Sequence, residues 1–163
     1  MENTDRSFFH EFTDNLNLKD MNYKEFYSEL GKLLYAVIDN DGVVSKSEKD
    51  RLKTIVKKQL VPLEHHVDAY GTNIAFYSEM EFDVLEDELP DIEATFNSFM
   101  DFVEEHQTEF DDTMKKVSLI IVKELSNVYL GTNKLERRLI DQLTKKLNKI
   151  KIKKRTQKIK NEN

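Results

Sequence analysis

The chain lacks cysteine and has only four glycines and two prolines among its 163 residues. The absence of cysteine excludes disulfide bonds and thiolate zinc sites. The small number of glycines and prolines leaves little material for the many tight turns of an all-β fold. No apolar run approaches the about 20 residues that span a bilayer, and no apolar signal core follows Met1. We therefore expect a helical, single-domain, cytoplasmic protein.

The chain does have apolar residues at three- and four-residue steps along most of its length, as amphipathic helices do. This spacing predicts an all-α bundle of about seven helices within residues 1–150, starting with a short helix between Phe8 and Leu16. Residues 22–38 form a broad apolar stripe and predict a core helix. Residues 117–122 are apolar almost all round, which predicts a central position for their helix. A further helix is expected to bury a stripe formed by Phe76, Tyr77, Met80, Val84 and Leu85.

The net charge of −6 is distributed unevenly along the chain. No Lys or Arg lies between Lys58 and Lys115, a stretch that contains 16 carboxylates. Like charges three or four residues apart on a helix repel by a few tenths of a kcal/mol, which a basic partner or a cation would relieve. The segment is expected to be either a solvated face or an interaction surface for a basic protein partner. The surface residues predicted for the second case are Glu79, Asp83, Glu86 and Asp87.

The C-terminal end has the opposite charge, with nine Lys or Arg and one acid from Lys145 to Asn163. Residues 151–163 are expected to form a basic, partly disordered tail that enters solvent from about Arg155. Such a tail attracts nucleic acid or an anionic membrane. Because it lacks interleaved aromatic residues, a solvated tail is the preferred interpretation, and nucleic acid is not an expected partner.

A glycine turn between two expected helices is the best candidate for a site. Asp39-Asn40-Asp41-Gly42 is followed by Ser45 and Glu48, the pattern of a capping box at a helix start. Calcium and magnesium prefer oxygen ligands, so Asp39, Asp41 and Glu48 are the predicted metal ligands. Against an EF-hand template, the first ligand position falls on Val37, which has no side-chain oxygen. A purely structural turn with a capped helix remains the alternative.

Other candidate sites are weaker. Glu64, His65, His66 and Asp68 lie within five residues, but adjacent histidines point in different directions on a helix, and no His or Cys follows at four residues. No spacing places a nucleophile beside a base. The protein is therefore not expected to be an enzyme.

The residues from Ala36 through Asp39-Asn40-Asp41-Gly42 to Glu48 resemble the tellurite-resistance TerB-like helical family. The later segment Gly131-Thr132-Asn133-Lys134-Leu135-Glu136 resembles that family's second hairpin, although it lacks an Asp-Gly pair. The similarity covers roughly residues 25 to 145. It implies an all-α bundle with two weakly related helical hairpins, a link to stress responses, and acidic residues that bind divalent cations.

Two functions are consistent with these patterns. The first is a non-enzymatic stress-response module that binds calcium or magnesium through Asp39, Asp41 and Glu48. The second is an adaptor that docks a basic protein on its acidic face and uses the Asp39 turn only as structure.

Overall fold

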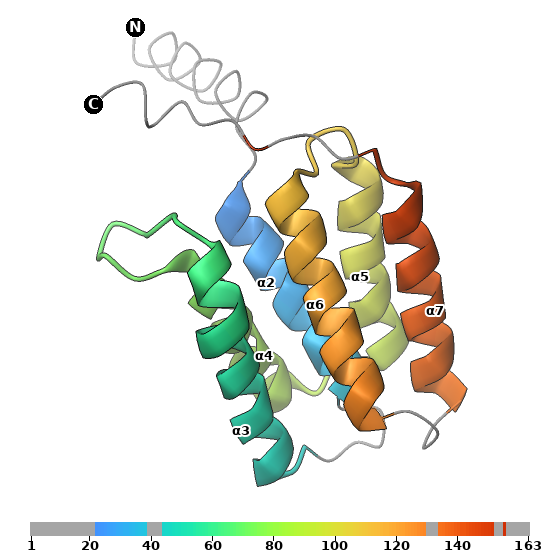
Figure 1. Cartoon of the computed structure of the whole chain (residues 1–163). Coiled ribbons are helices and arrows are strands. Elements are labelled where there is room, and N and C mark those ends of the chain that lie inside the picture. Colours follow the sequence, from blue (N-terminus) through green and yellow to red (C-terminus); the bar gives the residue numbers. More distant parts are fainter. Residues whose placement is uncertain (1–21, 39–43, 130–133, 152–154, 156–163) are drawn as a thin grey trace, which may run out of the picture.

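The computed structural model describes residues 22–38, 44–129, 134–151 and 155 (Figure 1). Between residues 125 and 136 it describes the backbone of the helices but not the side chains. Within these residues the regular elements are helices, and the β-structure consists of one isolated bridge between Val67 and Asn73. The predicted all-α class is confirmed. The expected helix between Phe8 and Leu16 and the turns at 39–43 and 130–133 lie outside the described residues. The described α-helices are α2 (Tyr23–Ile38), α3 (Lys46–Ile55), α4 (Tyr77–Glu88), α5 (Ile92–Glu105), α6 (Asp112–Tyr129) and α7 (Lys134–Lys149).

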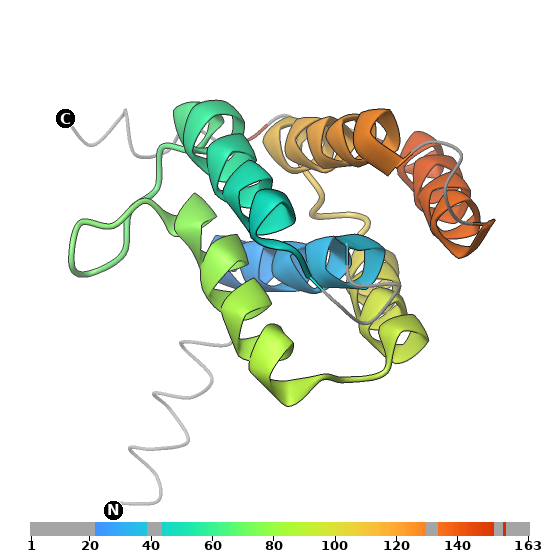
Figure 2. The ribbon, with the colours of Figure 1, turned by 90° about the horizontal axis from the view of Figure 1, so that it is seen from below.

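Helix α2 occupies the centre of the bundle. Helices α4 and α5 pack along one side of it, and α6 contacts the other side with α7 beyond (Figure 2). Ten of the 16 residues of α2 are buried, including Gly31 and Ala36. In α6, by contrast, Leu119 and Ile120 are only partly buried. The prediction that the 117–122 helix is central was wrong, because α6 lies in an outer layer and α2 is enclosed instead.

The helix that begins at Lys46 is longer than its regular α-helical part. Ser45 caps its start, and the structure continues past Ile55 as a π-helical turn (Val56–Leu60) and a 3-10 turn (Val61–Leu63). Pro62 lies in the 3-10 turn, where its missing N–H and fixed φ are tolerated. Glu64 therefore follows directly after three kinds of helical turn at the end of this segment.

Helix α4 confirms only part of the predicted apolar stripe. Leu85 is buried and Phe76 and Tyr77 are partly buried against the core, but Met80 is 51% exposed and Val84 is 47% exposed. The buried face of α4 instead consists of Ser78, Phe82 and Leu85, at helical steps of four and three residues. The small Ser78 side chain allows α4 to approach α2 closely, which turns Met80 and Val84 outward.

Helices α2 and α4 approach each other closely at Gly31. A Cβ atom built at this glycine would lie 2.6 Å from the backbone oxygen of Ser78 and 2.8 Å from Cβ of Glu81. Both distances are far below van der Waals contact, and a backbone oxygen within a helix has little freedom to move. Glycine is therefore required at this position by packing, even though it lowers helix propensity.

We predict that Gly31→Ala destabilises the fold. Alanine favours a helix by about 1 kcal/mol over glycine, but the overlap with Ser78 forces α2 and α4 apart at a cost of about 1 to 3 kcal/mol. Chemical denaturation should show a lower free energy of unfolding, with Asn97→Ala on the exposed face of α5 as the control. A Gly31→Ala protein more stable than the wild type would contradict this close packing.

Candidate functional site

The predicted metal loop is described only at its end. Asp39 and Asp41 lie outside the described residues, so their side chains are not placed. Glu48 is placed, and it completes the predicted capping box: its Oε1 accepts a 3.1 Å hydrogen bond from the backbone N of Ser45, and Ser45 Oγ accepts one from Glu48 N. Among the residues that the structure describes, no group of three His, Asp or Glu side chains is arranged to hold a metal ion. The capping role of Ser45 and Glu48 is confirmed.

The acidic residues of α4 divide into two groups. Glu79 and Glu86 are half-buried, and Glu86 forms a 2.5 Å ion pair with Lys49 of α3. Burial raises the pKa of Glu79, and the positive charge of Lys53 opposes this rise. Asp83 and Asp87 are exposed. Helix α3 therefore supplies basic side chains to one edge of the predicted interaction surface. Sequence spacing alone did not indicate that α3 lies beside α4.

Exposed apolar side chains lie on the same face of α4 as the exposed acids. Met80 and Val84 are four residues apart. Asp83 lies three residues after Met80, and Asp87 lies three residues after Val84. Residues at these steps are neighbours on one helical face. We call this set the α4 stripe, defined as Met80, Asp83, Val84 and Asp87. It combines two half-exposed apolar groups with two carboxylates.

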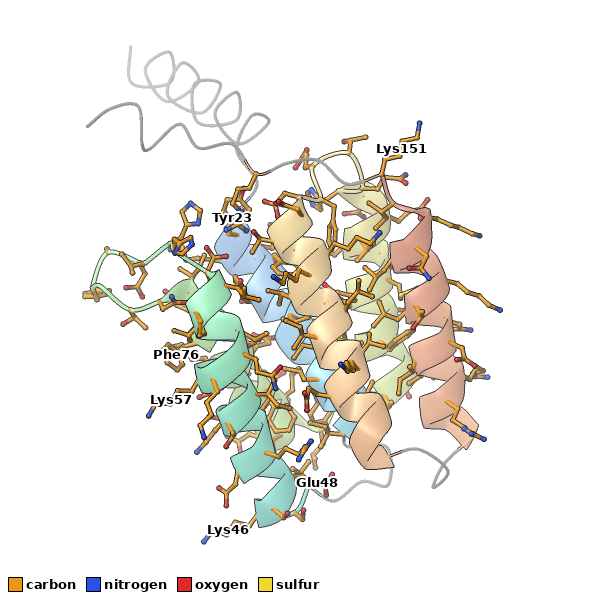
Figure 3. The ribbon with its side chains drawn as sticks, in the orientation of Figure 1. Tyr23, Lys46, Glu48, Lys57, Phe76 and Lys151 are labelled. Atoms are coloured by element: carbon orange, nitrogen blue, oxygen red, sulfur yellow. The ribbon has the colours of Figure 1, made fainter. Side chains whose placement is uncertain are left out.

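A second group of polar residues is buried at the other end of the bundle from Glu48, near Tyr23 (Figure 3). Glu64 is 2% exposed and Asp111 is 3% exposed. Glu64 follows the 3-10 turn, while Asp111 precedes α6 and its Oδ1 accepts a 2.8 Å hydrogen bond from Met114 N. Two buried carboxylates are costly unless they are paired and hydrogen-bonded. We call the group the Glu64 cluster, formed by Glu64, Asp111, Arg155, Tyr23, Tyr27 and His66.

The positive charge of the Glu64 cluster comes from Arg155. Its Nε donates to Asp111 Oδ2 at 2.8 Å and its Nη1 donates to Glu64 Oε2 at 2.9 Å. The guanidinium carbon lies 4.1 Å from the centre of the Tyr23 ring, within the range of a cation–π contact. Burial would lower the pKa of Arg155, but its hydrogen bonds to the two carboxylates raise it instead. One guanidinium thus pairs with both carboxyl groups.

This placement differs from the expectation that the chain enters solvent from about Arg155. The arginine side chain is only 13% exposed, and its backbone N also donates to Asp112 Oδ1 at 3.2 Å. Lys151 is exposed, and the remaining residues of the expected tail lie outside the described part of the chain.

The remaining acceptors of Glu64 are occupied by neighbours. Tyr27 Oη donates to Glu64 Oε1 at 2.8 Å, and the backbone N and Nδ1 of His66 lie 3.1 and 2.7 Å from Oε2. Burial alone would raise the pKa of Glu64, but these hydrogen bonds from His66 and Arg155, with the charge of Arg155, lower it to about 2. Burial and the adjacent carboxylates raise the pKa of both Tyr23 and Tyr27. Glu64 is therefore ionised at pH 7, and the phenols of Tyr23 and Tyr27 are neutral.

The crowded Glu64, His66 and Asp68 segment therefore has a structural explanation. The His66 ring stacks on Tyr23 with centroids 4.8 Å apart, and its Nδ1 bonds Glu64. Asp68 Oδ1 accepts from the backbone N of Tyr70 and of Thr72, and its Oδ2 accepts from Tyr77 Oη.

Asp68 also shapes a loop that projects from the bundle beside α3, residues 64–73 (Figure 1). Gly71 adopts a φ of 82° there, which L-residues rarely adopt. The loop presents Tyr70, 94% exposed, and Val67, 58% exposed. The hydrogen bonds of Asp68 fix the turn on which Tyr70 is displayed.

A shallow groove of about 550 Å³ lies between α5 and α7. Lys146 and Glu104 form an ion pair on its lining, and Arg138 of α7 pairs with Glu93 of α5 outside the groove. Two basic residues of α7 are thus paired with acids of α5. The groove is lined by Asn97, Met100, Glu104, Gln107, Gln142, Lys145, Lys146, Lys149 and Ile150.

We predict that Glu64 makes folding stability depend on acidic pH. Its pKa is lower in the folded state than the ordinary value of 4.5, so its contribution is complete above pH 4.5 and is lost as the pH falls toward 2. The contribution at neutral pH is about 3 kcal/mol at most. The difference in unfolding free energy between wild type and Glu64→Gln, measured in urea, should shrink over this range.

The control for this measurement is Glu105→Gln, which removes an exposed carboxylate of α5. Its stability difference from the wild type should change little with pH. If the difference in unfolding free energy between wild type and Glu64→Gln stays constant from pH 6 to pH 2, the Glu64 carboxylate is not favourably paired in the folded state.

No family model, curated protein or solved structure matches the sequence. None of the helices within the described residues is both long and apolar enough to cross a membrane.

Proposed function

We propose that the protein is a non-enzymatic helical adaptor that binds a basic amphipathic segment of a partner protein on the α4 stripe. The observation behind this proposal is the exposure of Met80 and Val84 on the same face as Asp83 and Asp87. Apolar groups rimmed by charge are typical of protein interaction surfaces. The acids select a basic partner, and the apolar pair contributes affinity when it is buried.

The buried side of α4 supports this role. Phe82 is fully buried, and Ser78 packs against Gly31 of α2. The side of α4 opposite the stripe is therefore fixed by core packing. A rigid face loses little conformational entropy when a partner binds. The ion pair between Lys49 and Glu86 borders the stripe and limits the surface on the side of α3.

The test uses a fluorescent synthetic peptide whose helix has leucine on one face and lysine on the other. Its dissociation constant is measured by anisotropy. Replacing Met80 and Val84 together with serine should weaken binding about tenfold, because each side chain loses part of its apolar burial. Replacing Asp83 and Asp87 with asparagine should flatten the dependence of binding on salt.

The matched control removes the same charge elsewhere, by combining Asp101→Asn with Glu105→Gln on the exposed side of α5. This variant should bind the peptide as the wild type does. Equal binding by the wild type and by the Met80 and Val84 variant would overturn the α4 stripe as the docking surface.

A second proposal, which is compatible with the first, concerns the turn before α3. The capping box of Ser45 and Glu48 supports it, because the box fixes the start of α3 directly after Asp39 and Asp41. A cation on this turn would agree with the stress-response role that the TerB-like resemblance implies. Since Glu48 already caps the helix, Asp39 and Asp41 would supply the main ligands to calcium or magnesium.

We predict that millimolar calcium or magnesium gives binding heat with the wild type and raises its melting temperature. Both effects should disappear when Asp39 and Asp41 are replaced by asparagine. The Asp101→Asn, Glu105→Gln variant serves as the charge-matched control and should keep both effects. If the wild type gives no heat at millimolar ion, the cation site does not exist.

A further inference from the structure

The Glu64 cluster has the features of a binding site for a guanidinium group. The side chain of Glu64 is fully buried and that of Asp111 is 4% exposed, and an oxygen of each meets a different nitrogen of Arg155. Two carboxylates placed for one planar, forked cation are selective for arginine over lysine. The Tyr23 ring stacks on the guanidinium at 4.1 Å. We call this the arginine socket, defined as Glu64, Asp111 and Tyr23.

The socket is held in shape by residues other than its occupant. Tyr27 and His66 hydrogen-bond Glu64, and the backbone of Met114 hydrogen-bonds Asp111. These contacts come from α2, α6 and the start of the 64–73 loop. Both carboxyl groups are therefore held in position by contacts other than those with Arg155.

The occupant comes from a distant part of the chain. Arg155 lies 91 residues from Glu64 and 44 residues from Asp111, beyond the last turn of α7. The socket holds it by the guanidinium, and the backbone N of Arg155 donates to Asp112 Oδ1 at 3.2 Å. Its Nη2 is buried without a hydrogen-bond partner among the described residues. Arg155 therefore leaves part of its bonding capacity unused in this position.

We propose that the arginine socket binds an arginine of a partner's peptide in exchange for Arg155, which occupies the site when the chain is alone. A peptide is favoured over a small guanidine because Asp112 accepts the backbone N–H of the bound arginine. The proposal is independent of the α4 stripe, which lies on another helix. It gives the chain a second docking site, one that its own C-terminal segment competes for.

The first test uses full-length Arg155→Ala, which empties the socket but leaves the carboxylates. Its melting temperature should fall, because two buried acids lose their counter-charge. The probe is a blocked tetrapeptide with the sequence of residues 153–156, Lys-Lys-Arg-Thr. Calorimetry should show that it binds Arg155→Ala at least about tenfold more tightly than the wild type, in which the site is already occupied.

Matched controls identify the interaction. The same tetrapeptide with citrulline in place of arginine keeps the shape but lacks the positive charge, and it should not bind. Adding Glu64→Gln to Arg155→Ala should weaken binding of the arginine peptide. Equal binding of the arginine and citrulline peptides, or no binding to a folded Arg155→Ala protein, would overturn the proposal.

A second measurement on the wild type avoids any dependence on how well Arg155→Ala folds. Nitrogen-15 NMR detects the Nε–H of Arg155, which donates to Asp111 when Arg155 occupies the socket. Excess unlabelled arginine tetrapeptide should shift this signal toward the position of a free arginine, and the citrulline peptide should leave it unchanged. A signal that does not respond at saturating arginine peptide would show that Arg155 does not exchange and would refute the proposal.

Discussion

The enclosure of α2 is the constraint on which the rest of the bundle depends. Helices α4 and α5 cover one side of α2 and α6 contacts the other, so their buried faces must match its surface. At Gly31 and Ser78, the backbones of α2 and α4 come close enough to exclude a Cβ atom. This contact sets the rotation of α4 about its axis. The exposure of Met80 and Val84 follows from that rotation.

Much of the fold was predictable, because period and capping are local properties. The all-α class and the helix start at Ser45 were evident from spacing and turn residues. The choice of central helix was not, since several segments are apolar enough to be enclosed. The burial of Leu85 in α4 was predicted, but that of Phe82 was missed, because Met80 and Val84 fit the helical period as well as Phe82 does. Packing against Gly31 and Tyr35 of α2 distinguishes the two faces.

The site residues were harder to predict than the fold, because they combine distant segments. Glu64 and His66 belong to a segment that is visibly crowded with polar residues in the sequence, but their neighbours Tyr23 and Tyr27 belong to α2. Nothing local connects any of them to Arg155. One signal was present: Arg155 is the single arginine among the nine basic residues that begin at Lys145. A lone guanidinium among lysines is suited to a bidentate partner, which lysine cannot match.

The distance of Arg155 along the chain from its partners also has a consequence for folding. Arg155 is separated from Glu64 by 91 residues and from Asp111 by 44 residues. Contacts between residues so far apart close long loops, and the entropy of the loop must be lost before the contact stabilises the fold. We therefore expect the ionic contacts of Arg155 to form after the local turns of the helices, in the later part of folding.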